Sequence, residues 1–85
     1  MARLKIVRAT GETIVSITPV VEVAFEKMAG QGLYKQLREH EQNSDLYWLA
    51  HNALMRTEVI PRFGDDFLNT LISVEVIEDE AVKKG

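Results

Sequence analysis

The chain contains no cysteine, which excludes disulfide bonds and most structural zinc sites. No segment approaches the ~20 consecutive apolar residues that a membrane-spanning helix needs. Residues 1–5 alternate polar and apolar side chains, whereas a signal peptide has a continuous apolar stretch. Basic residues are scattered and number 10 against 13 acidic ones, so no clustered phosphate-binding surface is expected. These absences predict a cytoplasmic protein that binds neither membranes nor nucleic acid.

Eighty-five residues are enough for one domain only. A chain of this size buries roughly 60% of the surface that its unfolded form exposes, so its core is thin. Small domains often compensate with disulfides, a metal or a partner subunit. Because cysteine is absent, the remaining option is a partner, either a second copy of the chain or a different protein.

The first half predicts a β-hairpin followed by a helix. Residues 3–8 alternate polar and apolar side chains, and residues 12–17 are rich in β-branched ones, with Gly11 free to adopt the positive φ of a tight turn. Thr18 and Pro19 are typical of an N-cap and a first helical position, and Gly30 of a helix end. These signals predict a helix over 19–29.

The second half predicts further helices. A short helix is expected over 33–39, then a loop over 40–43, then a helix over 45–57 with Ser44 as its N-cap. Asp65 or Asp66 is expected to cap a last helix that carries the apolar residues between 67 and 72. Residues 73–77 fit either a continuation of this helix or a third strand, and their β-branched alternation favours a strand near 74–77.

The predicted fold class is therefore α+β, an N-terminal antiparallel hairpin packed against three to four short helices. Residues 1–77 form the single domain, and residues 78–85 form a polar tail that is expected to fray.

No group of residues predicts catalysis, a metal site or a cofactor. Ser44 is better explained as a helix cap than as a nucleophile. His40 lies between Glu39 and Glu41, but adjacent residues point in different directions and rarely converge on one ion. His51 has no carboxylate three or four residues away, so both histidines are expected on the solvated surface. We expect a protein that is not an enzyme.

The aromatic residues lie mostly after residue 33 and allow two interpretations. They fill a small core, or some of them anchor an interface, since tyrosine and tryptophan dominate binding hot spots. Trp48 and Tyr47 are the strongest anchors on the second interpretation. The predicted protein-binding residues are Tyr34, Leu37, Tyr47, Trp48, Phe63 and Phe67.

Several stretches together resemble the small tail assembly chaperones of long-tailed bacteriophages. They are Ile17 to Glu22 with Ala24 to Glu26, Tyr34-Lys35 with Arg38-Glu39, Ser44 to Ala50, and Phe63-Gly64 with Phe67-Leu68, Leu71 and Val74 to Val76. The resemblance covers nearly the whole chain up to residue 77. It depends on the order and spacing of these stretches, because none of them is a diagnostic motif.

The resemblance implies a protein that coats the tape-measure protein and recruits tail-tube subunits in the cytoplasm of the infected host cell, and that is absent from the mature virion. Such chaperones occur as a short form and a frameshifted long form, and this chain matches the short form. Two other functions stay open at this point. One is a structural subunit of a phage assembly, such as a head–tail connector or an accessory ring built from copies of the chain, and the other is a small regulatory binding protein.

Overall fold

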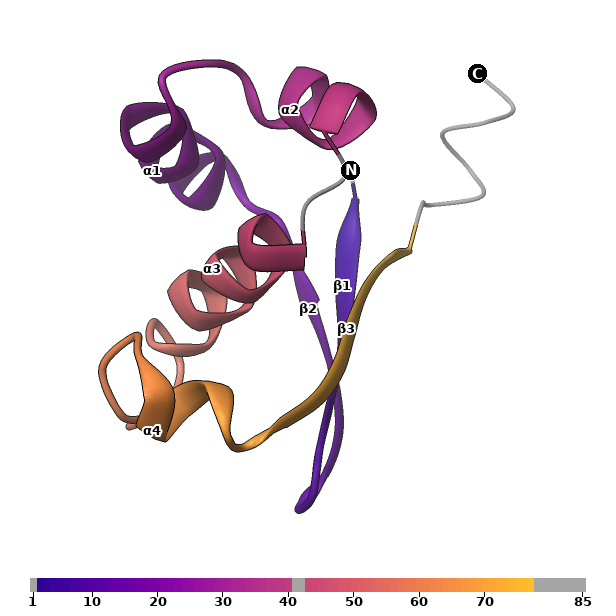
Figure 1. Ribbon diagram of the computed structural model, residues 1–85, viewed down its shortest axis with the longest axis vertical. Coiled ribbons are helices and arrows are strands. Elements are labelled where there is room, and N and C mark those ends of the chain that lie inside the picture. The colour runs from indigo at the N-terminus through magenta and orange to yellow at the C-terminus, as the bar shows by residue number, and fades with distance from the viewer. Residues whose placement is uncertain (1, 41–42, 78–85) are drawn as a thin grey trace.

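The computed structural model describes residues 2–40 and 43–77, apart from the side chains of residues 37–40. Its elements are β1 (Arg3–Arg8), β2 (Gly11–Ser16), α1 (Pro19–Ala29), α2 (Leu33–His40), α3 (Asn43–Leu54), α4 (Asp65–Leu68) and β3 (Leu71–Ile77). The strands form one antiparallel sheet in the order β2-β1-β3, and α1, α3 and α4 lie on one side of it (Figure 1). The predicted α+β class, the N-terminal hairpin and the third strand are confirmed.

The hairpin turns through two residues, because Arg8 of β1 pairs directly with Gly11 of β2. Gly11 has a φ of 140°, a value that side-chain-bearing residues rarely adopt, so the glycine is required there. β3 pairs with the other edge of β1, with Ile6 opposite Val74, and a bulge between Val7 and Arg8 shifts the register.

The predicted α1 is confirmed at both ends. Pro19 occupies the first turn, and Gly30 follows the last turn in the left-handed conformation with a φ of 80°. Thr18 has the extended backbone of an N-cap residue, but its side chain makes no capping hydrogen bond. Residue spacing and backbone preference therefore determine this helix start without help from the hydroxyl group.

The predicted bounds of α3 were wrong at both ends. The helix begins at Asn43, so Ser44 lies inside its first turn and is not the N-cap. It ends at Leu54, three residues before the predicted end, where Thr57 donates both its backbone N–H (3.0 Å) and its hydroxyl (3.2 Å) to the Leu54 carbonyl. A threonine hydroxyl that bonds a local carbonyl competes with helix continuation in this way.

The last helix is also shorter than predicted. α4 ends at Leu68, where the backbone N–H and hydroxyl of Thr70 bond the Phe67 carbonyl at 2.9 and 2.6 Å. Leu71 and Ile72, expected in this helix, instead begin β3. These two residues belong to a strand and not a helix because β3 pairs with the free edge of β1, which exists only in the folded chain.

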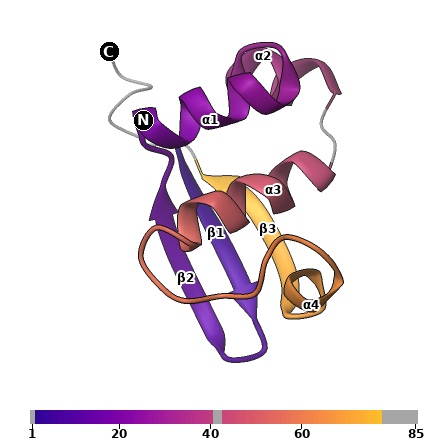
Figure 2. The same ribbon diagram turned by 90° about the vertical axis from the view of Figure 1, so that its left-hand side faces the viewer.

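The core lies between the sheet and the helices. Leu4 and Ile6 of β1 are fully buried on the helix-covered face, and α3 crosses that face diagonally (Figure 2). Phe25 of α1 and Phe67 of α4 are the largest fully buried side chains. On the other face, Lys5 lies 3.6 Å from Glu12 and 3.8 Å from Glu75, an exposed cross-strand charge cluster. No helix in the described residues is long and apolar enough to cross a membrane.

Candidate protein-binding site

Helix α1 carries two apolar faces. Val21 and Phe25 point into the core, and both are essentially inaccessible to solvent. Val20 and Val23 lie on a second face and remain 56% and 50% exposed. With Ala24 and Lys27 they follow the i, i+3, i+4, i+7 spacing that places side chains on one side of a helix. α1 therefore presents a second apolar stripe that the described residues leave uncovered.

This stripe lines one of two neighbouring hollows, which share Arg56. The first has a volume of about 490 Å³ and lies along α1. The second, of about 420 Å³, lies between the outer edge of β2, the start of α1 and the end of α3. Together they form what we call the α1–β2 groove. Its lining residues are Thr13, Ile14, Val15, Ser16, Thr18, Pro19, Val20, Val21, Val23, Ala24, Lys27, Ala53, Arg56 and Thr57.

The positions of β2, α1 and α3 in the fold create this groove. β2 is an edge strand, so nothing in the sheet pairs with its outer side. α1 leaves the end of β2 after only two residues, and α3 returns across the sheet toward β2 (Figure 2). Arg56 Nε donates to Asn52 Oδ1 at 3.1 Å, which holds the guanidinium beside the end of α3.

The charge of the groove differs from that of the chain. The chain has a net charge of −3, yet none of the groove's lining residues is acidic. Lys27 and Arg56 are its only ionised side chains, and neither forms an ion pair within the described part of the chain. The groove is therefore an apolar surface with two cationic groups on an otherwise acidic protein.

The two predicted tyrosines, Tyr34 of α2 and Tyr47 of α3, are both partly accessible to solvent. Tyr34 is 42% exposed, and its hydroxyl donates to Glu22 Oε2 at 3.0 Å, linking α2 to α1. Partial burial, with smaller effects of the hydrogen bond and charge of Glu22, raises the pKa of Tyr34 above its ordinary value, while a hydrogen bond from the Ala2 backbone acts in the opposite sense. Tyr47 is half-buried against the core.

Trp48 is also half-buried, and it has a partner within the chain. Its ring meets Phe25 edge-on, with a centroid distance of 5.9 Å and an interplanar angle of 72°. This geometry is one that aromatic pairs prefer. Trp48 therefore packs α3 against α1, as expected if the aromatic residues fill the core.

Two more of the predicted binding residues, Phe63 and Phe67, lie together where the chain packs against His51 of α3. Phe67 is fully buried, so it belongs to the core and offers no surface to a partner. Phe63 is 43% exposed, and its ring lies 5.6 Å from His51 and 6.3 Å from Phe67. The side chain of Leu37 lies outside the described residues.

His51 was expected on the solvated surface, and the structure shows that it is only partly exposed there. The ring is half-buried, meets Phe67 edge-on at 4.8 Å, and places Nε2 2.9 Å from the Pro61 carbonyl oxygen. The chain returns at residues 61–67 to cover this part of α3. Such a contact between residues at least ten positions apart leaves no signal in the helical spacing of α3.

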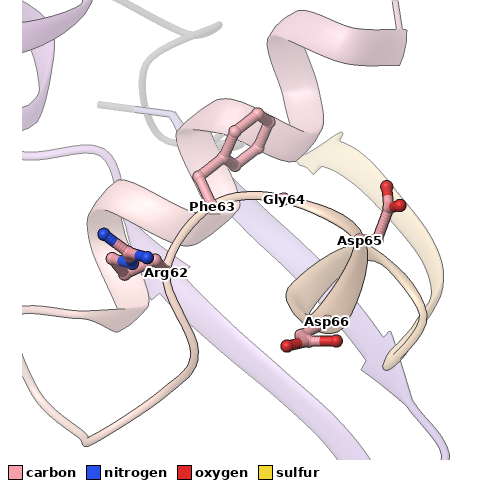
Figure 3. Close-up of a pocket in the computed structure, with 5 residues that line it drawn as sticks. All are labelled: Arg62, Phe63, Gly64, Asp65 and Asp66. Carbon is pink, nitrogen blue, oxygen red and sulfur yellow. The ribbon is translucent and has the colours of Figure 1, made fainter.

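A further hollow of about 410 Å³ lies at the start of α4. Arg62, Asp65 and Asp66 contribute its charged groups, but their side chains point away from one another (Figure 3). Catalysis needs groups that converge on one reacting atom. These side chains supply no such convergence, and no set of three His, Cys, Asp or Glu residues in the described ranges is placed to hold a metal ion.

The aromatic pattern did not identify the α1–β2 groove, because the groove is lined by valine, alanine, threonine and arginine. Its signal was present in the spacing of Val20, Val23, Ala24 and Lys27, beside the stripe of Val21 and Phe25. Only the packed structure tells which of the two stripes is covered. Comparison of the chain with protein-family models, curated proteins and solved structures found no match in any of the three.

Proposed function

We propose that the chain is a non-enzymatic chaperone for the assembly of a long bacteriophage tail, which covers the tape-measure protein and recruits tail-tube subunits in the cytoplasm of the infected cell. The observation that supports this proposal is the α1–β2 groove, an apolar surface that no other described element covers. The resemblance noted in the sequence supplies the identity of the partners.

The groove suits a helical partner of this kind. Residues three and four apart form the ridges by which two helices pack, and the outward stripe of α1 provides such a ridge. A long helical protein offers many similar apolar stripes before its tube encloses it. Several copies of a small protein, each binding weakly, then cover the target because it offers many binding sites. Tube subunits can displace such weakly bound copies.

Co-expression tests the proposal. The tagged chain is produced together with the tape-measure protein of the same phage, and the soluble fraction is purified through the tag. We expect a soluble complex with several copies of the chain for each tape measure, and virions that lack the chain. If the tape measure stays insoluble while the chain elutes alone as a discrete ring, and the chain is found in purified virions, it is a structural subunit instead.

A further inference from the structure

The α1–β2 groove carries information about the chemistry of its occupant. We infer that the occupant is an amphipathic helix whose apolar stripe is flanked by carboxylates, an inference that rests on the proposed function and specifies its binding site. The apolar part of the argument comes from α1, and the charged part comes from Lys27 and Arg56.

The apolar floor fits a helix laid against α1. Val20 and Val23 project from the outward stripe with about half of their surface exposed, and Ala24 lies beside them with only a methyl group. A small residue beside larger ones lets a second helix approach to the 8–10 Å axial separation typical of packed helices. The occupant needs apolar side chains at the same i, i+3, i+4 spacing to fill this surface.

The cations favour carboxylates on the occupant. Arg56 is held by Asn52 through Nε, and its two terminal nitrogens form no hydrogen bond with any described residue. A guanidinium binds a carboxylate through two parallel hydrogen bonds. Lys27 lies on the same stripe of α1 as Val20 and Val23. The nearest acidic residues of α1 are Glu22 and Glu26, and neither lines the hollow. Glu26 lies three residues after Val23, at the edge of the outward stripe, so Lys27 and Arg56 remain the only charged groups of the lining itself.

A second copy of the chain is a less suitable occupant. In a two-fold symmetric contact the same surface appears on both sides, so this groove would face another groove with two cations and no carboxylate. Such a contact supplies no charge partner for Lys27 or Arg56. An acidic helix from a different protein supplies both.

The test uses two synthetic helical peptides of about 20 residues with the same leucine stripe, flanked by glutamate in one and by lysine in the other. Binding to the full chain is measured by fluorescence anisotropy at low and high salt. We expect the glutamate peptide to bind at least tenfold more tightly than the lysine peptide, with affinity falling severalfold as salt is raised. Equal affinities, or no binding of either peptide, would overturn the inference.

Variants locate the binding to the groove. Lys27→Glu with Arg56→Glu should reverse the preference between the two peptides, whereas Lys35→Glu with Arg62→Glu, which makes the same charge change outside the groove, should leave it unchanged. Val23→Asp should abolish binding, and Val59→Asp, the same substitution at an exposed position outside the groove, should not. The far-ultraviolet circular dichroism and unfolding temperature of each variant show that it is folded.

The outcomes separate this inference from the proposed function. If the groove variants capture the tape-measure protein as well as the unmodified chain does, the groove assignment fails and the chaperone proposal stands. If the glutamate peptide binds in the groove but the tape measure is not captured, the chaperone proposal fails and the ligand chemistry stands. A concentration-dependent dimer in analytical ultracentrifugation that Val23→Asp abolishes would overturn the inference in favour of a second copy.

Discussion

The α1–β2 groove and the aromatic cluster of His51, Phe63 and Phe67 both expose apolar surface, but they differ in what their side chains contact. Phe63 is 43% exposed, yet one side of its ring packs on His51 and Phe67. Val20 and Val23 are exposed to a similar degree, at 56% and 50%, on a face of α1 that turns away from the core.

The comparison shows that exposed fraction alone does not identify a binding surface. The aromatic cluster belongs to the packed core. Its rings meet edge to face, and the His51 ring nitrogen contacts the Pro61 carbonyl, so these side chains already have partners within the chain. The groove has a mostly apolar lining and two cations that form no ion pair with any described residue. Substitutions in the cluster should therefore change stability, and substitutions in the groove should change binding.

The largest expected effect is that of Phe67→Ala. Phe67 is fully buried and contacts both His51 and Phe63, so its removal leaves a cavity that costs about 3–5 kcal/mol of unfolding free energy. Urea denaturation followed by circular dichroism measures the loss. Phe67→Leu, which retains most of the volume, is the control and should lose less. A change below about 1 kcal/mol for Phe67→Ala would mean that the cluster is not part of the core.

Phe63→Ala should have a smaller effect of about 1 kcal/mol, because it removes ring contacts with His51 and Phe67 but leaves little cavity at the surface. The same denaturation experiment detects it. Capture of the tape-measure protein by the folded variant should be unchanged. Loss of capture with unchanged stability would instead make the aromatic cluster, and not the groove, the binding surface.

Tyr34→Phe should alter how stability depends on pH. Because the pKa of Tyr34 is raised in the folded state, the neutral phenol is favoured there, and its contribution to stability is complete below the unfolded pKa of about 10. That contribution is lost as the pH rises through the higher folded value. Thermal unfolding between pH 8 and 12 should therefore show a shallower alkaline decline for Tyr34→Phe. Glu22→Gln removes the charge that accepts the Tyr34 hydrogen bond, so its alkaline loss of stability should be intermediate. Identical pH profiles for the unmodified chain and both variants would show that Tyr34 does not contribute to this pH dependence.

The smallest expected change in stability is that of Val20→Ser combined with Val23→Ser. Serine and valine have similar helix propensities, and both positions face outward, so the free energy of unfolding should stay within about 0.5 kcal/mol of the original. Binding to the glutamate-flanked peptide should nevertheless fall at least tenfold. A stability loss above about 2 kcal/mol would show that this stripe is already covered within the folded chain.

Local signals were sufficient for the first half of the fold. The period-two alternation of residues 3–8, the positive φ available to Gly11, and the pair of Pro19 and Gly30 around α1 each act within a few residues. They predicted the hairpin and α1 almost to the residue. The fold class followed, because a hairpin of this length needs helices or strands to cover one of its faces.

The tertiary structure decided the ends of the later elements and the place of the binding surface. α4 stops at Leu68 and β3 starts at Leu71 because β1 has a free edge with which β3 pairs, from Arg8 opposite Leu71 to Arg3 opposite Ile77. The same kind of long-range packing buries Phe67, engages Trp48 with Phe25, and covers one apolar stripe of α1 while leaving the other outside. Helical spacing by itself defines both stripes equally well, and only the position of the sheet distinguishes the core from the groove.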